Sequence, residues 1–526
     1  MSKISIFFFI VIFFCFGYLK AQVIHPDQVG GEYYDVLEMM NPDIDQRLYE
    51  HPAILSKFKK DSLTWNPWEL DFRNPEENYF SILPIQFGLN YNSEYPRTIN
   101  DGAVWKGKGL NSSVYFGIQG KKGILEYSLA PLIYYSQNQN YQLATQRGST
   151  NPLNYQFSNG RIDYPQRFGK SSFTEYDWAQ SEVRLVYSGF TFGASTSNTV
   201  WGPAKYNPIL RSNNAAGFPH IEIGTNKPYE TSIVDFEFKL LWGSLEESDY
   251  FDADKENNYR YLAGGFLAFQ PRFIKGLKLG FGRMMYKRFN EFEAIDLLVM
   301  AYRYDDADRN PDNPNTGNDD FDQLAALSME WTFPEQGFEA YMEFGKNDFG
   351  GVLGGQEPEH SRAYTLGFSK LLLLKDDKII KLAYERAVLD RSKAAFLYRR
   401  HNIWYQHSYI RQGYTHKGQV IGAGIGPGSS SDVFDFDLFT KNGKLQLFAQ
   451  RIRFNDDYYF DTFNDQFHHD HEWFLEAMYS RTIDSWLIST SFGLTSRKNM
   501  NYIQGNDSNN FILGLSFKKF FDRVKK

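Results

Sequence analysis

One stretch of the sequence, residues 201–220, is dense in side chains that can bind a sugar. The residues that could do so are Trp201, Tyr206, Arg211, Asn213 and Asn214. Aromatic rings offer flat faces to sugar rings, and amide side chains supply both a donor and an acceptor to neighbouring hydroxyls. A guanidinium can pair with the carboxylate of an acidic sugar. The stretch therefore predicts a sugar-binding loop, but its composition equally fits a loop that folds inward and only constricts the molecule.

Two polar clusters offer possible metal ligands, but their spacing argues against a metal site. In the acidic segment 305–322, an EF-hand loop that began at Asp306 would have Pro311 at the position that needs glycine. The second cluster lies in an acidic loop, where the spacing imposes no fixed geometry on zinc: His468, His469 and His471. We therefore expect no metal and no cofactor.

The sequence also contains little that predicts an enzyme. Glu339 and Glu343 can lie on one face of a strand, but two carboxylates alone are weak evidence for glycoside hydrolysis. No nucleophile elbow or phosphate-binding loop is present in the sequence. We therefore expect a protein that is not an enzyme.

Alternation of apolar and polar residues predicts the elements that hold these residues. Around the turn pair Ser188-Gly189, a two-residue turn would pair Tyr187 with Phe190 and Leu185 with Phe192. Val183 would then pair with Ala194, so all six side chains share one apolar face. Such a hairpin is typical of an antiparallel sheet.

A second hairpin is predicted around the loop 120–123. There Ile118 should meet Leu125, and Phe116 should meet Tyr127. Val114 should meet Leu129. Similar alternation continues from about residue 80 to residue 518.

In a membrane barrel the apolar set of each strand faces lipid, so the polar set must face the lumen. The residues predicted to face the lumen are Asp235, Glu237, Lys239, Glu339, Tyr341 and Glu343. About 440 residues at roughly 25 per strand and connection give about 16 to 18 strands. We predict an all-β fold, an antiparallel transmembrane β-barrel of about 18 strands, over residues 76–526.

The N-terminus has the pattern of a secretion signal. Lys3 precedes an apolar run, and cleavage is expected after Ala21 or Gln22, so residues 1–22 form a signal peptide; a membrane anchor is the alternative. Residues 23–75 should form short helices at the periplasmic side of the barrel, around Tyr34 to Met40, Ile44 to Tyr49 and Ile54 to Phe58, unless this segment is a loosely ordered leader.

Charge and composition exclude some partners. The net charge of −7 argues against nucleic acid, which needs a basic face. Aromatic residues make up 17% of the chain, more than a soluble core needs, and membrane barrels place such residues in girdles at both lipid interfaces. A secreted β-sandwich or propeller is the soluble alternative.

Several ordered segments together resemble the Wzi-type capsule assembly proteins of Gram-negative outer membranes. The segments are 101–109, 163–169, 201–220, 282–285, 339–343 and 407–418. The resemblance implies an 18-stranded outer-membrane barrel with a helical part at the periplasmic side. It also implies a lectin-like protein, rather than an enzyme, that holds capsular or extracellular polysaccharide at the cell surface.

From this resemblance and the pattern together, we expect a monomer in the cell outer membrane that contacts outer-membrane lipid. An outer-membrane porin or sugar-uptake channel is the alternative function. The acidic external loops would repel an acidic capsule unless cations intervene, so the sugar can differ from the acidic examples of the family.

Overall fold

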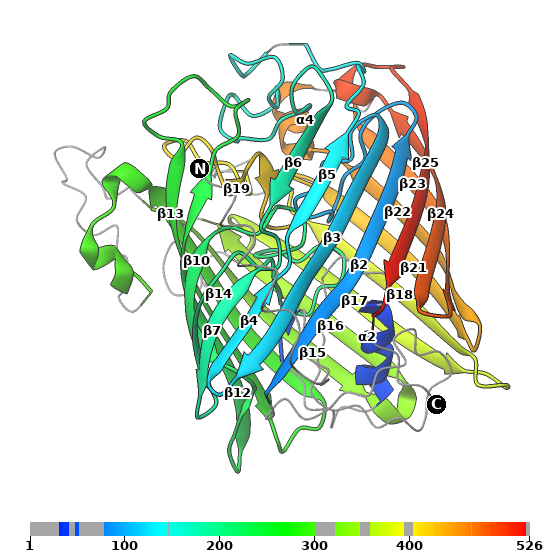
Figure 1. Ribbon diagram of the computed structural model, residues 1–526. Helices are drawn as coiled ribbons and strands as arrows, with labels where there is room; N and C mark the ends of the chain where they lie inside the picture. The colour runs from blue at the N-terminus through cyan, green and yellow to red at the C-terminus, as the bar shows by residue number, and fades with distance from the viewer. Residues whose placement is uncertain are drawn as a thin grey trace, which may run out of the picture.

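A computed structural model describes residues 31–40, 48–51, 78–145, 147–300, 321–347, 358–393, 403–463, 465 and 467–521. These residues form a closed antiparallel β-barrel (Figure 1). Three of its strands are interrupted and are named as two parts each, β4 with β5, β6 with β7, and β10 with β11. When each pair is taken as one strand the barrel has 18 strands, as the alternation predicted.

The wall is built from consecutive neighbours along the chain. The first half comprises β2 (Tyr79–Asn92), β3 (Gly109–Lys122), β4 (Leu125–Leu129), β5 (Leu132–Ser136), β6 (Phe173–Asp177), β7 (Glu182–Tyr187), β8 (Phe190–Ser195), β10 (His220–Thr225), β11 (Tyr229–Glu230), β12 (Val234–Glu246), β13 (Tyr259–Pro271) and β14 (Leu277–Arg288). The second half comprises β15 (Asp322–Phe333), β16 (Phe338–Asn347), β17 (Arg362–Leu373), β18 (Ile379–Val388), β21 (Ser430–Thr440), β22 (Gly443–Arg453), β23 (His471–Ile483), β24 (Trp486–Lys498) and β25 (Ser508–Lys519). Pairing of β2 with β25 closes the barrel.

The first predicted hairpin is confirmed. Tyr187 pairs with Phe190, Leu185 with Phe192, and Val183 with Ala194. Their outward side chains are among the exposed apolar residues of the wall; for example, Val183 is 54% exposed.

The second predicted register is wrong. Ile118 pairs with Leu129 rather than with Leu125, and Val114 pairs with Ile133. The strands continue to a tight turn at Gly123, whose φ of +60° suits glycine, so the loop is shorter than the sequence suggested. Because the shift is an even number of residues, the same side chains still face lipid.

The short turns and the helix α2 (Gly31–Met40) lie at one end of the barrel, and the long connections lie at the other (Figure 1). Membrane barrels have short periplasmic turns and long external loops, so α2 marks the periplasmic end. None of the helices in the described part of the chain is long and apolar enough to cross a membrane.

Only the first of the three expected N-terminal helices is present among the described residues. The described end of the second, Leu48 and Tyr49, is a bend that leads into β1 (Glu50–His51), which pairs with β9 (Val200–Trp201). A strand partner thus replaces the helix there. The third expected helix and residues 1–22 lie outside the described residues, and the boundaries at residues 22 and 75 stay predictions.

Two inward segments fill much of the lumen. Two segments fold into it from the external end, one joining β8 to β10 and one joining β18 to β21, which contains the hairpin β19 (Thr415–His416) and β20 (Gln419–Val420). Their buried side chains form one cluster with the inner wall, including Ile209, Leu210, Phe218, Trp404, Tyr405 and Tyr414. The inward segments and the wall therefore share one packed core, and a separate cavity of about 270 Å³ lies against β2, β3 and β24.

The face assignment gives a direct test. Leu447 is 48% exposed on the outer face of β22, near the middle of the strand. Leu447→Arg should destabilise the folded barrel by about 2–4 kcal/mol, because a charge then faces the hydrocarbon. Unfolding in lipid vesicles measures this, with Leu447→Phe as the control; equal stability of the two variants would show that Leu447 does not face lipid.

Candidate polysaccharide-binding site

A cavity of about 170 Å³ lies inside the external end of the barrel. Six separate parts of the chain line it, and they include the β2–β3 connection, the long β5–β6 connection and the chain at the external ends of β22, β23 and β24. The polar and aromatic residues that line it include Tyr95, Arg97, Trp105, Tyr141, Tyr155, Tyr164, Gln166, Asn214, Asp470, Glu472, Arg497, Asn501 and Tyr502.

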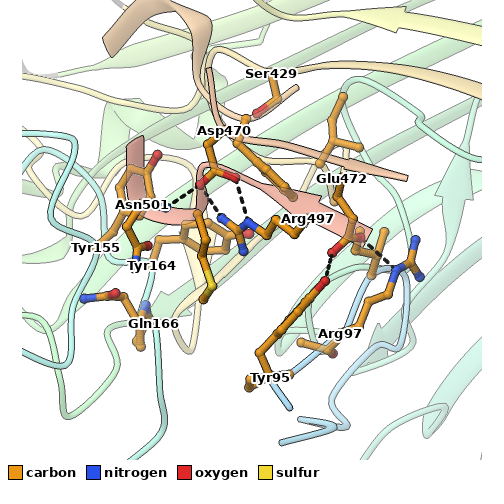
Figure 2. Close-up of a pocket in the computed structure, with 18 of the residues that line it drawn as sticks. Tyr95, Arg97, Tyr155, Tyr164, Gln166, Ser429, Asp470, Glu472, Arg497 and Asn501 are labelled. Carbon is orange, nitrogen blue, oxygen red and sulfur yellow. Dashed lines mark hydrogen bonds and ion pairs between the residues drawn. The ribbon is translucent and has the colours of Figure 1, made fainter. Parts of the chain in front are cut away.

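One wall of the cavity is an aspartate held by an arginine. The guanidinium of Arg497 donates to both carboxylate oxygens of Asp470, at 2.7 and 2.6 Å, and the backbone N–H of Asn501 donates to the same carboxylate at 2.8 Å (Figure 2). The guanidinium also lies 4.4 Å from the ring centroid of Phe454. This bidentate pair is fixed in orientation, because both donors and both acceptors are engaged.

A second ion pair lies on the neighbouring strand. Glu472 accepts from Arg97 at 3.1 Å and from the Tyr95 hydroxyl at 2.8 Å (Figure 2). Arg97 also donates to Gln450 at 2.6 Å and lies 3.5 Å over the Phe474 ring. The β2–β3 connection is thereby tied to β22 and β23, across the ends of β24 and β25.

Aromatic side chains from the β5–β6 connection form the other wall. The rings of Tyr155 and Tyr164 meet edge to face, with centroids 5.6 Å apart. Burial raises the pKa of both phenols, so their hydroxyls stay protonated and can donate. Asn455 donates to the Tyr155 hydroxyl at 2.9 Å.

The cavity thus combines aromatic rings, amides and fixed charges of both signs within one small volume. Such a set stacks on the apolar faces of a sugar ring and exchanges hydrogen bonds with its hydroxyls. The guanidiniums are partly occupied by their carboxylates, so the local charge is nearly balanced. A neutral or weakly charged sugar unit fits this chemistry better than a free polyanion does.

Of the five residues predicted to bind sugar, Asn214 lines the cavity. Its side chain donates to the carbonyl of Val420 at 2.9 Å and accepts from the backbone of Asn100 at 3.2 Å. Asn213 lies beside it and donates to the Asn100 carbonyl at 2.9 Å.

The other three residues lie deeper in the lumen. The Trp201 ring is 4.7 Å from that of Phe266, centroid to centroid. Arg211 is 1% exposed and donates to the carbonyl of Ser197 at 3.1 Å. The Tyr206 hydroxyl donates to Asp435 on the barrel wall at 2.7 Å. A direct role for these residues in sugar binding stays a prediction, and their contacts here are with other parts of the protein.

The residues predicted to face the lumen on β16 hold the inward segment. Glu343 accepts from the backbone N–H groups of Ala204 at 3.1 Å and Ile209 at 2.8 Å. Glu339 forms an ion pair with Lys205 of the inward segment at 3.6 Å. The Tyr341 hydroxyl donates to Glu385 of the neighbouring wall at 3.0 Å. Carboxylates of the wall thus satisfy backbone donors of residues 204–209, which belong to no strand.

On β12, Glu237 accepts from the backbone N–H groups of Leu48 at 3.0 Å and Tyr49 at 3.3 Å, which anchors the N-terminal segment. Lys239 pairs with Glu222 at 2.7 Å on the neighbouring strand β10. Asp235 pairs with Arg272 at 2.8 Å near the periplasmic turn.

Of the two possible metal sites, the structure describes the histidine cluster in full. Most of the acidic segment 305–322 lies outside the described residues. His468 pairs with Asp465 at 2.8 Å and His469 with Asp456 at 3.1 Å, beside the helix α4 (Asp456–Thr462). Among the described residues, no group of three or more potential ligands could hold a metal ion.

Most residues of the cavity were not predicted from the sequence. Tyr95, Arg97 and Arg497 come from segments whose patterns indicated only strand ends. A partial signal existed, because Tyr164 and Gln166 belong to the segment 163–169 that resembled the family.

Comparisons with known proteins agree with this architecture. The chain is similar to the solved structure of Wzi from Escherichia coli, with 12% identity, coverage of 82% of this chain and 84% of that chain, and a TM-score of 0.56. That protein is described as an outer membrane protein involved in group 1 capsule assembly and as a carbohydrate-binding β-barrel. It is more distantly similar to OccAB4 of Acinetobacter baumannii (12% identity, 85% and 100% coverage, TM-score 0.42) and to OprD of Pseudomonas aeruginosa (10% identity, 87% and 97% coverage, TM-score 0.39). A comparison with curated proteins found no match. A model of the capsule assembly protein Wzi family matches residues 93–481, so the chain belongs to this family of outer-membrane barrels.

Proposed function

We propose that this protein binds surface polysaccharide at the external cavity and so supports the assembly and retention of a capsule or exopolysaccharide. The observation that carries the proposal is the cavity itself, where tyrosines, amides and arginine–carboxylate pairs meet at the external mouth of a family member. We further propose that it acts as a monomer surrounded by outer-membrane lipid.

The filled lumen argues against the alternative of a porin or sugar-uptake channel. A diffusion channel needs a continuous water-filled path. Here the inward segments pack side chains such as Trp404, Tyr405 and Phe218, all at most 1% exposed, across the barrel.

Binding without hydrolysis is the favoured chemistry. Glycoside hydrolysis needs one carboxylic acid that can give up a proton and one free carboxylate. Asp470 and Glu472 at the cavity are each engaged by an arginine, at 2.6 and 3.1 Å. Glu339 and Glu343 lie in the packed interior instead, where a polysaccharide chain has no room.

Cells that lack this protein should make polysaccharide but release most of it into the medium, because nothing then holds the chains at the surface. Cell-bound and released polysaccharide are measured in the deletion strain and in the same strain carrying the intact gene. An unchanged ratio in the deletion strain would contradict the proposed function.

A further inference from the structure

The connection after β14 folds outward over the barrel wall instead of away from the membrane. It contains two 3₁₀ helices, η2 (Phe289–Glu291) and η3 (Ala294–Leu298), and we call residues 289–300 the outer flap. The indole N–H of Trp242 donates to the carbonyl of Leu297 at 3.0 Å, and the hydroxyl of Tyr261 donates to that of Asp296 at 2.9 Å. Figure 1 shows the flap in green, outside the wall near β13.

The flap is firmly held to the wall. Lys287 at the end of β14 pairs with Asp296 at 3.0 Å, and both side chains are at most 6% exposed. Tyr261, Ala263, Met285 and Val299 form a buried cluster between flap and wall. The far side of the flap remains apolar, with exposed fractions of 53% for Ile295, 46% for Leu297 and 57% for Leu298. A flap that is apolar on both faces is suited to contact with lipid.

Beside the flap the barrel wall is low. The strand β8 has six residues, whereas β12 has thirteen, and the neighbours of β8 are the interrupted strands β6 with β7 and β10 with β11. Strands rise about 3.3 Å per residue and tilt by about 45°, so six residues climb only about 14 Å of an apolar band about 25 Å tall. At β8 the external edge of the wall therefore lies at the depth of the outer leaflet. The chain enters the lumen after Ser195 and returns to the wall at His220.

A groove occupies this place on the outside of the barrel. Its floor includes Val183, Ala194 and Ile221 of the short strands. One side is formed by Phe289 and Phe292 of the flap with Trp242, and the other by Trp178 at the end of β6. Its volume of about 1220 Å³ exceeds the roughly 300–1,000 Å³ of ordinary small-ligand pockets, so a long ligand fits.

The external rim of the groove is polar. Lys417, which is 44% exposed, pairs with Asp177 at 3.1 Å, and its backbone N–H donates to the backbone carbonyl of Glu246 at 2.8 Å. An ammonium carries three N–H donors, so Lys417 can reach a phosphate while it keeps its contact with Asp177. The groove therefore offers an apolar trough at the depth of acyl chains and, at the depth of headgroups, an exposed ammonium in a lining that also includes the carboxylates of Asp177, Glu182 and Glu246.

We propose that this groove holds an acyl chain of a phosphorylated glycolipid of the outer leaflet, with its headgroup at Lys417. At this depth the molecules that surround the wall are lipids, and the outer leaflet is built from lipopolysaccharide. The bound glycolipid occupies the low part of the wall, between the flap and β6, and seals the packed lumen from the hydrocarbon. This site lies outside the barrel and is independent of polysaccharide binding at the cavity.

The test fills the floor of the groove with a large side chain. Ala194→Trp and, separately, Val183→Trp each place an indole on the floor, and both positions already face lipid. Ala477→Trp, on the outward face of β23 far from the groove, is the matched control. The full protein is purified from outer membranes in mild detergent, and native mass spectrometry counts the lipopolysaccharide molecules that each assembled variant retains.

We expect one retained lipopolysaccharide in the unmodified protein and in the control, and at least a tenfold lower occupancy in both groove variants. Delipidated protein incubated with lipopolysaccharide should regain the bound species, and an excess of phosphatidylethanolamine should not displace it. Equal occupancy in all four proteins, or none in the unmodified protein, would overturn the proposal. Equal binding of the phospholipid, or a dimer that only the groove variants lose, would assign the groove to another occupant.

Discussion

Replacing Arg97 and Tyr164 together with alanine should weaken polysaccharide binding at least a hundredfold while leaving the barrel assembled. The change removes one charged donor and one aromatic face from opposite walls of the cavity. A hydrogen bond to a charged group contributes about 1.5–3 kcal/mol, and every 1.4 kcal/mol is a factor of ten in the dissociation constant. Loss of the ring face adds to this, so the two changes together exceed two factors of ten.

The dissociation constant is measured by titrating detergent-solubilised protein with the purified polysaccharide, and heat-modifiability on gels reports assembly. Tyr164→Phe keeps the ring and should cost much less than Tyr164→Ala. The matched control is Arg386→Ala, because this arginine also has a carboxylate partner, Asp432 at 2.7 Å, but does not line the cavity. Full affinity in an assembled Arg97/Tyr164 variant would exclude the cavity as the binding site.

Removing the inward segment should turn the protein into an ion-conducting pore. Ser195 and His220 are direct partners on adjacent antiparallel strands, so a short turn can join them in place of residues 196–219. The deletion removes Ile209, Leu210 and Phe218 from the packed interior and leaves Glu343 and Glu385 lining the lumen. Water can then enter and solvate both carboxylates.

Conductance in planar bilayers measures this change, with the unmodified protein as the silent reference. The same deletion removes all five residues predicted to bind sugar, so cell-bound polysaccharide is measured in parallel. Open pores with unchanged retention would restrict residues 201–220 to the role of a plug. Closed pores in an assembled deletion variant would show that the segment joining β18 to β21 fills the lumen alone.

The faces of the strands could be predicted from the sequence because alternation has a period of two and lipid tolerates no charge. Val183 and Phe192 were assigned to one face on this basis, and in the structure Val183 pairs with Ala194, Phe192 pairs with Leu185, and both side chains are exposed. The register predicted at β3 and β4 was wrong, because any even shift preserves the faces and the pattern therefore cannot select among such registers. The turn at Gly123, and not the pattern, decides that register.

The cavity could be predicted only in part. Its residues run from Tyr95 to Tyr502 and come together only when the barrel closes, so no local sequence pattern predicts them. The stretch 201–220 was conspicuous, yet its side chains serve two demands at once. Beyond β9 this stretch has no strand partners for its backbone, so its polar groups need other partners, and Arg211 and Asn213 supply hydrogen bonds inside the protein.

The seam between β2 and β25 also constrains the order in which the chain can fold into the closed barrel. There the side chains of Ser93 and Asn510, 417 positions apart, meet at 2.9 Å. Contacts of such sequence separation form late, because the entropy of closing a long loop must be overcome first. The side chains that fill the lumen cannot enter through a completed wall. We therefore expect an ordered biogenesis in which the chain wraps around its own interior and the terminal strands join last.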